Sequence, residues 1–229
     1  MLDDLKEEVF QANLALQRAG LVVLTCGNAS GLDRERGLVV IKPSGVSYAE
    51  MRPEHMVIVD LDGQVVQGKL RPSSDTPTHL ELYRNFPGIG GVAHTHSPYA
   101  TAWAQAKRSL PCLGTTHADH FRGTVPVTKD LTPQALAGDY ELETGRAIVA
   151  AFSNLNPHEI PAVLVASHGP FTWGPSATAA VQNSIVLEQV ALMALITQGL
   201  TPDAPSISQQ LLDKHFLRKH GKDAYYGQR

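Results

Sequence analysis

The hydrophobic positions at the start of the chain follow a helical period. Leu5, Val9 and Leu16 lie on one stripe, and acidic residues fill the first turn. Residues three or four positions apart share a face of a helix, and negative charge favours its N-terminal end. The pattern therefore predicts an amphipathic helix over residues 2–19 that ends at Gly20.

Short apolar runs bounded by glycine, proline or aspartate predict the strands of a sheet. The predicted strands cover residues 21–25, 38–42, 91–95, 124–128 and 161–166, and a predicted hairpin covers residues 56–66. The hairpin should turn at Asp62-Gly63, because this dipeptide is typical of tight turns.

A Thr-Pro or Ser-Pro pair marks the start of three more predicted helices, with the hydroxyl as N-cap and proline at the first helical position. The pairs are Thr76-Pro77, with a helix to about Phe86, Ser97-Pro98, with a helix through Ala106, and Thr132-Pro133. The longest predicted helix covers residues 176–198 and ends at Gly199, and a last amphipathic helix covers about 206–219. No repeat or long linker interrupts this order. The order favours one α/β domain over residues 1–229, with helices covering a central sheet.

The composition is that of a folded protein, with 43% hydrophobic and 18% charged residues. A net charge of -3 gives no reason to expect a nucleic-acid partner, although a local basic pocket could still bind a small phosphorylated ligand. Cys26 and Cys112 form no C-x-x-C pair and are expected to be free thiols of a cytosolic protein. The acidic start is unlike a secretory signal, and no run approaches eighteen apolar residues. We therefore expect a cytoplasmic protein with no membrane span.

Two histidines one residue apart, in the stretch GGVAHTHS, are the first candidates for chemistry. Side chains alternate along a strand, so His94 and His96 should point the same way. His168 follows another predicted strand, and Asp75 directly precedes a predicted helix. Three imidazoles and one carboxylate are a ligand set of catalytic zinc. The alternative is a polar strand exit whose imidazoles bond to backbone or solvent, and spacing alone leaves both interpretations open.

The other histidines are less informative. Three of them are interpreted as surface or helix-face residues: His55, His79 and His158. His117 and His120 belong to the segment THADHF, whose Asp119 could transfer protons or could cap a turn. Spacing alone favours the turn.

Three short stretches could bind a phosphate group. They are Gly27-Asn28-Ala29-Ser30, Lys42-Pro43-Ser44-Gly45 and Ser73-Ser74. Together they supply an ammonium, several hydroxyls and backbone N–H donors beside glycine. No Walker or dinucleotide-binding pattern is present, so a nucleotide is not indicated. Each stretch alone is also compatible with an ordinary turn.

A family resemblance joins these stretches. In chain order, the sequence contains LTCGNAS, VIKPSGV, PSSDTPTHLELY, GGVAHTHS, GTTHADHF, SHGPFTWG and LLDKHFLRKHG…AYYGQ. This series resembles the class II aldolase superfamily and, within it, the bacterial L-ribulose-5-phosphate 4-epimerases, over essentially the whole chain. Asp75 and the last motif resemble the epimerases, since the related fuculose-phosphate aldolases carry glutamate at the place of Asp75.

The resemblance implies a fold, an assembly and a reaction. The fold would be a central, mainly antiparallel β-sheet flanked by helices in a three-layer sandwich. The assembly would be a homotetramer with active sites between subunits, in which the tail 221–229 reaches a neighbouring subunit. The reaction would interconvert L-ribulose 5-phosphate and D-xylulose 5-phosphate by cleaving and re-forming the C3–C4 bond.

The resemblance also implies a role for individual residues. The ligands of one Zn²⁺ per subunit, or of Mn²⁺ or Co²⁺, would be Asp75, His94, His96 and His168. The residues that bind the phosphate would be Ser44, Gly45, Ser73 and Ser74, with Asn28 and Lys42 close by. The proton-transfer residues would be Asp119 and Tyr226, with Tyr226 from the neighbouring subunit and His215 near the site.

Three other functions compete with the epimerase hypothesis. A class II sugar-phosphate aldolase would release the aldehyde instead of rotating it and re-forming the C3–C4 bond. A non-catalytic module like the head domain of adducin would have lost its metal ligands, whereas all four positions are filled here. A dehydratase on the same scaffold would share the metal site. The sequence also leaves open whether the substrate comes from arabinose or from ascorbate catabolism.

Overall fold

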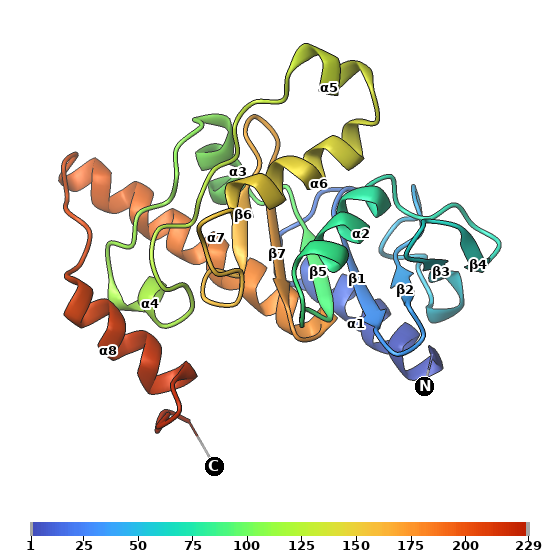
Figure 1. The fold of residues 1–229 in the computed structure, drawn as a ribbon, viewed down its shortest axis with the longest axis horizontal. Helices are drawn as coiled ribbons and strands as arrows, with labels where there is room; N and C mark the ends of the chain where they lie inside the picture. Colours follow the sequence, from blue (N-terminus) through green and yellow to red (C-terminus); the bar gives the residue numbers. More distant parts are fainter. Residues whose placement is uncertain (1, 228–229) are drawn as a thin grey trace.

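The computed structural model describes residues 2–227 (Figure 1). The helices are α1 (Leu2–Arg18), α2 (Thr76–Asn85), α3 (Pro98–Gln105), α4 (Thr115–Ala118), α5 (Pro133–Ala137), α6 (Tyr140–Ala151), α7 (Ala177–Leu200) and α8 (Gln209–His220), with a 3₁₀ turn at Pro53–His55. The strands are β1 (Asn28–Asp33), β2 (Leu38–Ile41), β3 (Val57–Asp60), β4 (Val65–Gln67), β5 (Gly91–His94), β6 (Ala162–Leu164) and β7 (Pro170–Gly174).

The seven strands form one sheet in the order β4-β3-β2-β1-β5-β7-β6, and every neighbouring pair is antiparallel. β3 and β4 form the predicted hairpin. The predicted fold class, a central antiparallel sheet flanked by helices, is confirmed.

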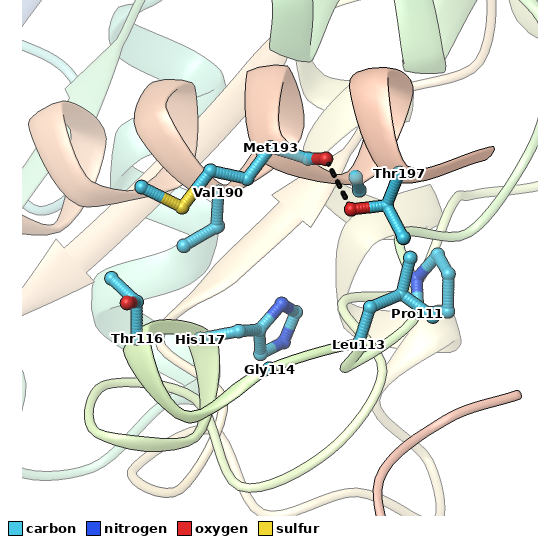
Figure 2. A pocket seen from close by; sticks show the side chains of 9 residues that line it. Pro111, Leu113, Gly114, Thr116, His117, Val190, Met193 and Thr197 are labelled. Atoms are coloured by element: carbon cyan, nitrogen blue, oxygen red, sulfur yellow. Dashed lines mark hydrogen bonds between the residues drawn. The ribbon is translucent and has the colours of Figure 1, made fainter. Parts of the chain in front are cut away.

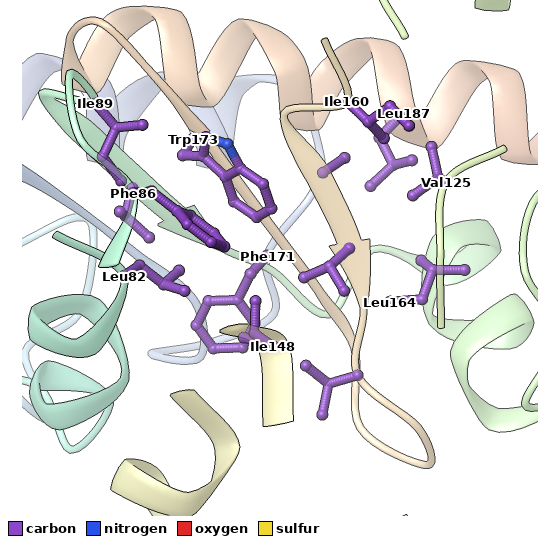
Figure 3. Packing of buried hydrophobic residues seen from close by; sticks show 14 of the residues in the cluster. Leu82, Phe86, Ile89, Val125, Ile148, Ile160, Leu164, Phe171, Trp173 and Leu187 are labelled. Carbon is purple, nitrogen blue, oxygen red and sulfur yellow. The ribbon is translucent and has the colours of Figure 1, made fainter. Parts of the chain in front are cut away.

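Alternation along the strands divides the core between the two faces of the sheet. In β3, Val57 and Val59 join one hydrophobic cluster while Ile58 joins the other. α1 and the start of α7 cover the second cluster, whereas α2 and α6 lie over the first face (Figure 1). The ring centres of Phe86 and Trp173 lie 4.9 Å apart in the larger cluster (Figure 3). The first cluster also includes residues of α3 and of the later part of α7.

Among residues 2–227, α7 is the one helix with the length and hydropathy of a membrane span, at 24 residues and a mean hydropathy of 1.5. Nine of its residues are buried, among them Leu187 and Ala191 in the core beside the sheet. This packing is that of a core helix. The helix continues past Gly199 to Leu200, so the predicted stop was wrong.

The predicted N-caps have three different outcomes. Thr132 accepts a hydrogen bond from the Ala135 amide, as expected. Ser97 makes no side-chain cap, and the buried Glu188 of α7 accepts from the Tyr99 and Ala100 amides instead, each at 2.9 Å. Thr76 is itself helical, and the N-cap of α2 is Asp75.

Two predicted strands are absent from the sheet. The run 21–25 is a loop in which Leu24 is 85% exposed and has a φ of 53°. The run 124–128 makes only isolated bridges, between Val125 and Leu110 and between Val127 and Leu164. Apolar side chains alone do not make a strand where no neighbouring strand pairs along its length.

The elements that were missed include β1, β7 and α6. β1 begins at Asn28, inside a stretch interpreted as a turn, and it pairs with β2 on one side and β5 on the other. β7 begins with Pro170, which is tolerated as the first residue of a strand. α6 begins after Asp139, whose carboxylate accepts from the Leu142 amide. The small and polar residues of β1 do not predict a central strand. β1 is buried because it pairs with a strand on each side, not because its side chains are apolar.

Candidate metal centre and substrate cavity

His94 and His96 meet at the end of β5. Their Nε2 atoms lie 3.1 Å apart, although β5 ends at His94 and His96 lies just beyond it. His94 pairs with Asn28 of β1 and Phe171 of β7, and its ring stacks on Phe171 at 4.2 Å. Its Nδ1–H donates to the Pro170 carbonyl at 2.9 Å, so the lone pair of Nε2 remains free. The sheet therefore positions Nε2 of His94, whose lone pair can bind a metal, next to Nε2 of His96.

His168 reaches the same place from the turn between β6 and β7. Ser167 has a φ of 61° there, an uncommon conformation that directs the chain back on itself. A Cβ on Gly169 would lie 2.7 Å from the Thr95 carbonyl, so only glycine lets the turn approach β5 this closely. The His168 ring lies 4.7 Å from that of His94 and 5.0 Å from that of His96.

The three imidazoles fit a tetrahedral divalent cation. One nitrogen from each ring lies within 4.8 Å of the others. Ligands at the usual Zn–N distance occupy tetrahedral corners about 3.4 Å apart. Burial lowers the pKa of His168 to about 4, helped by the neighbouring His94 and His96, and burial also lowers the pKa of His96. The rings of His96 and His168 are therefore neutral, as metal ligands must be.

Asp75 lies at the N-terminus of α2 and lines the same cavity as the three imidazoles. Its Oδ2 accepts a hydrogen bond from the Asn28 amide at 2.6 Å. Burial acts to raise its pKa, but His94, His79 and this hydrogen bond together hold the pKa of the carboxyl below its ordinary value. Asp75 is therefore ionised, and a carboxylate beside three imidazoles is a donor set for zinc.

The predicted phosphate-binding residues line the same cavity of about 400 Å³ as the metal ligands. Its lining comprises Thr25, Cys26, Gly27, Asn28, Lys42, Ser44, Gly45, Ser73, Ser74, Asp75, His94, His96, Tyr140, Glu141 and His168. Gly45 has a φ of 70°, which glycine adopts without strain in the turn after β2. One cavity thus contains all ten predicted metal-binding and substrate-binding residues.

Lys42 is held at the phosphate side of the cavity. The residue is only 2% exposed, and Nζ donates to the Thr25 carbonyl at 3.0 Å and lies 5.0 Å from the Tyr48 ring centre. Burial lowers its pKa, while the nearby Cys26 and Asp75 oppose this shift. A fixed ammonium beside hydroxyls suits a phosphate dianion.

Asn28 connects the two halves of the site. Its amide nitrogen donates both to Asp75 Oδ2 at 2.6 Å and to Ser73 Oγ at 3.1 Å. Both amide hydrogens are thereby used, so this side chain positions Ser73 and the carboxylate of Asp75 relative to each other. Its Oδ1 is buried without a hydrogen-bond partner.

Tyr140 and Glu141, at the start of α6, line the cavity and were missed because the helix itself was missed. The Tyr140 hydroxyl lies 3.2 Å from His168 Nδ1. If His168 binds metal through Nε2, its Nδ1–H donates to this hydroxyl, and such a partner orients a ligand. Burial raises the pKa of Tyr140, so the phenol stays protonated. The signal available in the sequence was Asp139 before two glutamates, a helix N-terminus pattern.

Tyr140→Phe should weaken Zn²⁺ binding by about tenfold, because loss of a partner that orients a ligating histidine has a cost of this order. A competition titration against a chromophoric chelator measures the affinity directly. Tyr99→Phe is the matched control, since Tyr99 packs against the core and does not line the cavity. A wild-type affinity for the Tyr140 variant would contradict the role.

His79 was interpreted as a surface or helix-face residue, and it lies on the buried face of the helix α2. Its side chain is fully buried in α2, with Nδ1 2.7 Å from Ser30 Oγ and Nε2 without a partner. Burial lowers its pKa to about 3, so the ring is neutral. Of the other two histidines in that group, His158 is exposed and His55 is partly buried.

The predicted proton-transfer residues form a second cluster, on α4 and α8. Asp119 accepts from His215 Nδ1 at 3.0 Å and from the Arg218 guanidinium at 2.8 Å. Arg218 also lies 4.9 Å from the ring centre of Tyr226, which is 60% exposed. Burial acts to raise the pKa of Asp119, but Arg218, His215 and Lys219 together lower it. None of the three predicted residues lines the metal cavity within one chain.

α8 is attached to the rest of the chain by a small separate cluster. Cys112, Ala118 and Leu212 are its buried members, and Ile207 packs against them. The Arg122 guanidinium adds ion pairs to Asp213 at 2.8 Å and to Glu159 at 2.7 Å. Residues 228–229 of the predicted tail lie outside the described residues.

A different cavity, of about 270 Å³, lies between α4 and α7 (Figure 2). The His117 ring points into it, facing Met193 and Thr197, and its Nε2–H donates to the Gly123 carbonyl at 2.7 Å. Burial lowers the pKa of His117 to about 4. No charged side chain lines this cavity in the described chain, so we assign the chemistry to the metal-centre cavity.

Comparison with known families identifies the scaffold. The family model for the Class II Aldolase and Adducin N-terminal domain matches residues 7–195. The chain belongs to the class II aldolase family. Class II aldolases are typically metal-dependent, and the three imidazoles of this chain fit that property.

Solved structures of class II aldolases share the fold over nearly the whole chain. An L-fuculose 1-phosphate aldolase aligns with a TM-score of 0.78 at 25% identity, covering 93% of this chain and 94% of that one. YgbL from Klebsiella pneumoniae aligns with a TM-score of 0.73 at 27% identity, covering 92% and 97%. The L-fuculose-1-phosphate aldolase from Thermus thermophilus aligns with a TM-score of 0.70 at 25% identity, covering 88% and 99%.

Proposed function

We propose that this class II aldolase family member is a metal-dependent L-ribulose-5-phosphate 4-epimerase, which interconverts L-ribulose 5-phosphate and D-xylulose 5-phosphate. The observation that carries the proposal is the cavity of about 400 Å³ in which Asp75 and three imidazoles face residues suited to a phosphate. Aspartate rather than glutamate at position 75, and the C-terminal motif, support an epimerase within the family.

The proposed reaction inverts C4, whose hydrogen is not acidic because C4 is not adjacent to the ketone. A base takes the C4 hydroxyl proton, the C3–C4 bond breaks, and its electron pair passes to an enediolate while glycolaldehyde phosphate forms. The aldehyde then rotates, the bond re-forms on its other face, and an acid returns the proton. When bound at the four ligands, a divalent cation supplies Lewis-acid stabilisation for the negative charge on the ketose oxygens.

The side chains of the chain would perform the remaining tasks. Lys42, Ser44 and Ser73 would hold the phosphate, so that the aldehyde stays in the cavity between bond cleavage and re-formation. The two epimeric hydroxyls point to opposite faces, so two proton-transfer groups are required. Asp119 and Tyr226, with His215 nearby, are the candidates.

Proton transfer requires an assembly in this proposal, because the cluster on α4 and α8 does not line the cavity of its own chain. We place the sites of a homotetramer between subunits, with Tyr226 supplied by a neighbour. Its 60% exposure leaves the phenol accessible to such a contact. A cytoplasmic location fits a phosphorylated sugar substrate.

A class II sugar-phosphate aldolase is the second candidate, favoured by structurally similar proteins that are named L-fuculose 1-phosphate aldolases, two of them at 25% identity. An adducin-like interaction module is less favoured, because His94, His96 and His168 lie close enough together to hold a metal ion.

One assay distinguishes the two enzymes. L-ribulose 5-phosphate is incubated with the protein, with and without a chelator, while D-xylulose 5-phosphate and free aldehyde are followed. The epimerase proposal predicts chelator-sensitive formation of D-xylulose 5-phosphate without aldehyde. Aldehyde that accumulates without the epimer would assign the aldolase activity instead.

Tyr226→Phe should reduce epimerase turnover by about 100-fold or more, because removing a positioned acid or base has an effect of this size. Zinc content should remain that of the wild type, since Tyr226 lies outside the metal cluster. Tyr225→Phe is the matched control, at 59% exposure in the same segment. Equal turnover in the two variants would remove Tyr226 from the mechanism.

A further inference from the structure

His79 lies in the core directly behind the candidate metal ligands. It is 0% exposed, and its ring contacts the edge of Phe171, the same ring on which His94 stacks. Its one hydrogen bond joins Nδ1 to Ser30 Oγ at 2.7 Å, and Ser30 Oγ lies 2.8 Å from the Tyr83 hydroxyl. The buried Nε2 has no partner.

The three linked polar groups determine which nitrogen of His79 carries the proton. If Tyr83 donates to Ser30 and Ser30 donates to Nδ1, both hydroxyl hydrogens are used and the ring proton lies on Nε2. If Nδ1 donated instead, one of the two hydroxyl hydrogens would have no acceptor within this group. The first arrangement is therefore favoured, and it leaves an N–H on Nε2 as the unmatched donor.

No acceptor, Asp75 included, lies within hydrogen-bond distance of His79 Nε2 in the described structure, but Asp75 is the N-cap of the same helix. The two residues stand four apart at the start of α2, where the His79 amide donates to the Asp75 carbonyl at 3.1 Å. Side chains four apart share a helix face. Asp75 is also the main charged group acting on the His79 ring, and it favours a proton there. Asn28 holds only one carboxylate oxygen, Oδ2.

We propose that His79 is a positioning residue whose Nε2–H hydrogen-bonds to Asp75 when the carboxylate binds a metal ion, and so orients the carboxylate toward the three imidazoles. The proposal rests on the proposed function in one respect, the role of Asp75 as a metal ligand. Ser30 and Tyr83 would contribute indirectly, because they favour the ring proton on Nε2. A buried neutral histidine with this orientation donates to the ligand without adding charge to the site.

The test compares Zn²⁺ affinities of metal-stripped variants by competition with a chromophoric chelator. His79→Leu removes both ring nitrogens and should weaken binding by about 10- to 100-fold, as loss of a partner that orients a ligand does. His79→Gln retains a donor and an acceptor and should recover most of this loss. Ser30→Ala, a small change that removes the hydroxyl fixing the proton, should weaken binding in the same direction and to a lesser extent.

His117→Leu is the matched control, because His117 is also a buried neutral histidine but lies on α4, outside the metal cavity. It should lower the thermal unfolding temperature and leave the Zn²⁺ affinity unchanged. An equal loss of affinity in the two leucine variants would reduce His79 to a packing role and overturn the proposal. The proposal is also overturned if His79→Leu folds and all three variants, His79→Leu, His79→Gln and Ser30→Ala, bind Zn²⁺ with wild-type affinity. If His79→Leu does not fold, wild-type affinity in Ser30→Ala overturns the proposal by itself.

Asp75→Asn separates this inference from the proposed function. If Asp75→Asn binds Zn²⁺ as the wild type does, the proposed ligand set fails, and with it the role of His79. If Asp75→Asn weakens binding, adding His79→Leu to it should cause little further loss, since the two changes remove one interaction. Fully additive losses would overturn the proposal while the ligand set stands.

Discussion

His96→Ala should lose both its zinc and its turnover. The variant retains His94, His168 and Asp75, but three ligands with an added water bind zinc more weakly and hold it in a different place. Loss of a residue that only hydrogen-bonds to a metal ligand reduces metal affinity or activity by about 10- to 100-fold. Loss of the ligand itself should therefore reduce turnover by more than about 100-fold. Zinc per chain by elemental analysis and epimerisation of L-ribulose 5-phosphate measure the two effects.

His158→Ala is the control for His96→Ala, because His158 is exposed and lies outside the metal cavity. It should retain wild-type zinc and turnover. A His96→Ala protein without metal but with normal turnover would contradict the metal assignment altogether.

The metal-stripped protein should lose stability steeply below pH 6.5. His79 and His117 are buried, with pKa values lowered to about 3 and about 4 from 6.5. The unfolded chain takes up protons on these rings as the pH falls through 6.5, whereas the folded chain does not. Unfolding is therefore favoured by about 1.4 kcal/mol per histidine per pH unit, or about 4 kcal/mol for both between pH 6.5 and 5. Urea unfolding at pH 7 and at pH 5 measures this difference.

His117→Gln should be less stable than wild type at pH 7 but should lose about 2 kcal/mol less stability between pH 7 and pH 5, because one of the titrating rings is removed. His158→Gln should preserve the full pH dependence, since His158 is exposed. Equal urea midpoints for the wild type at the two pH values would show that both buried rings take up protons without unfolding the chain.

Much of the fold was predictable because local signals and tertiary structure agree. The helical stripe of α1, the Asp62-Gly63 turn and the Thr132 cap are local, and each is confirmed. β1 could not be found in this way. Its sequence, NASGLD, has few apolar residues, and it becomes a strand because β2 and β5 pair with both of its edges. Residues 21–25 show the opposite case, an apolar run without a partner strand.

The candidate site was predictable where residue type carries the chemistry. Alternation aligned His94 with His96, and the geometry brings His168 and Asp75 to them. His79 and Tyr140 could not be recognised, because their roles depend on contacts between segments distant in the sequence, with Ser30 and with His168. The roles of Asp119, His215 and Tyr226 stay predictions, since in one chain they lie outside the metal cavity.

The small cluster beneath α8 has a consequence for the dynamics of the chain. Few buried apolar side chains attach α8 to the rest of the chain, whereas the sheet is buried by large hydrophobic clusters on both faces. Segments with few buried contacts open at a lower free energy than the global unfolding transition. The C-terminal helix should therefore exchange its amide hydrogens faster than β1 or β5 in the isolated chain. Tyr226 then belongs to a cooperative unit that can adjust to a neighbouring subunit without disturbing the sheet that holds the metal ligands.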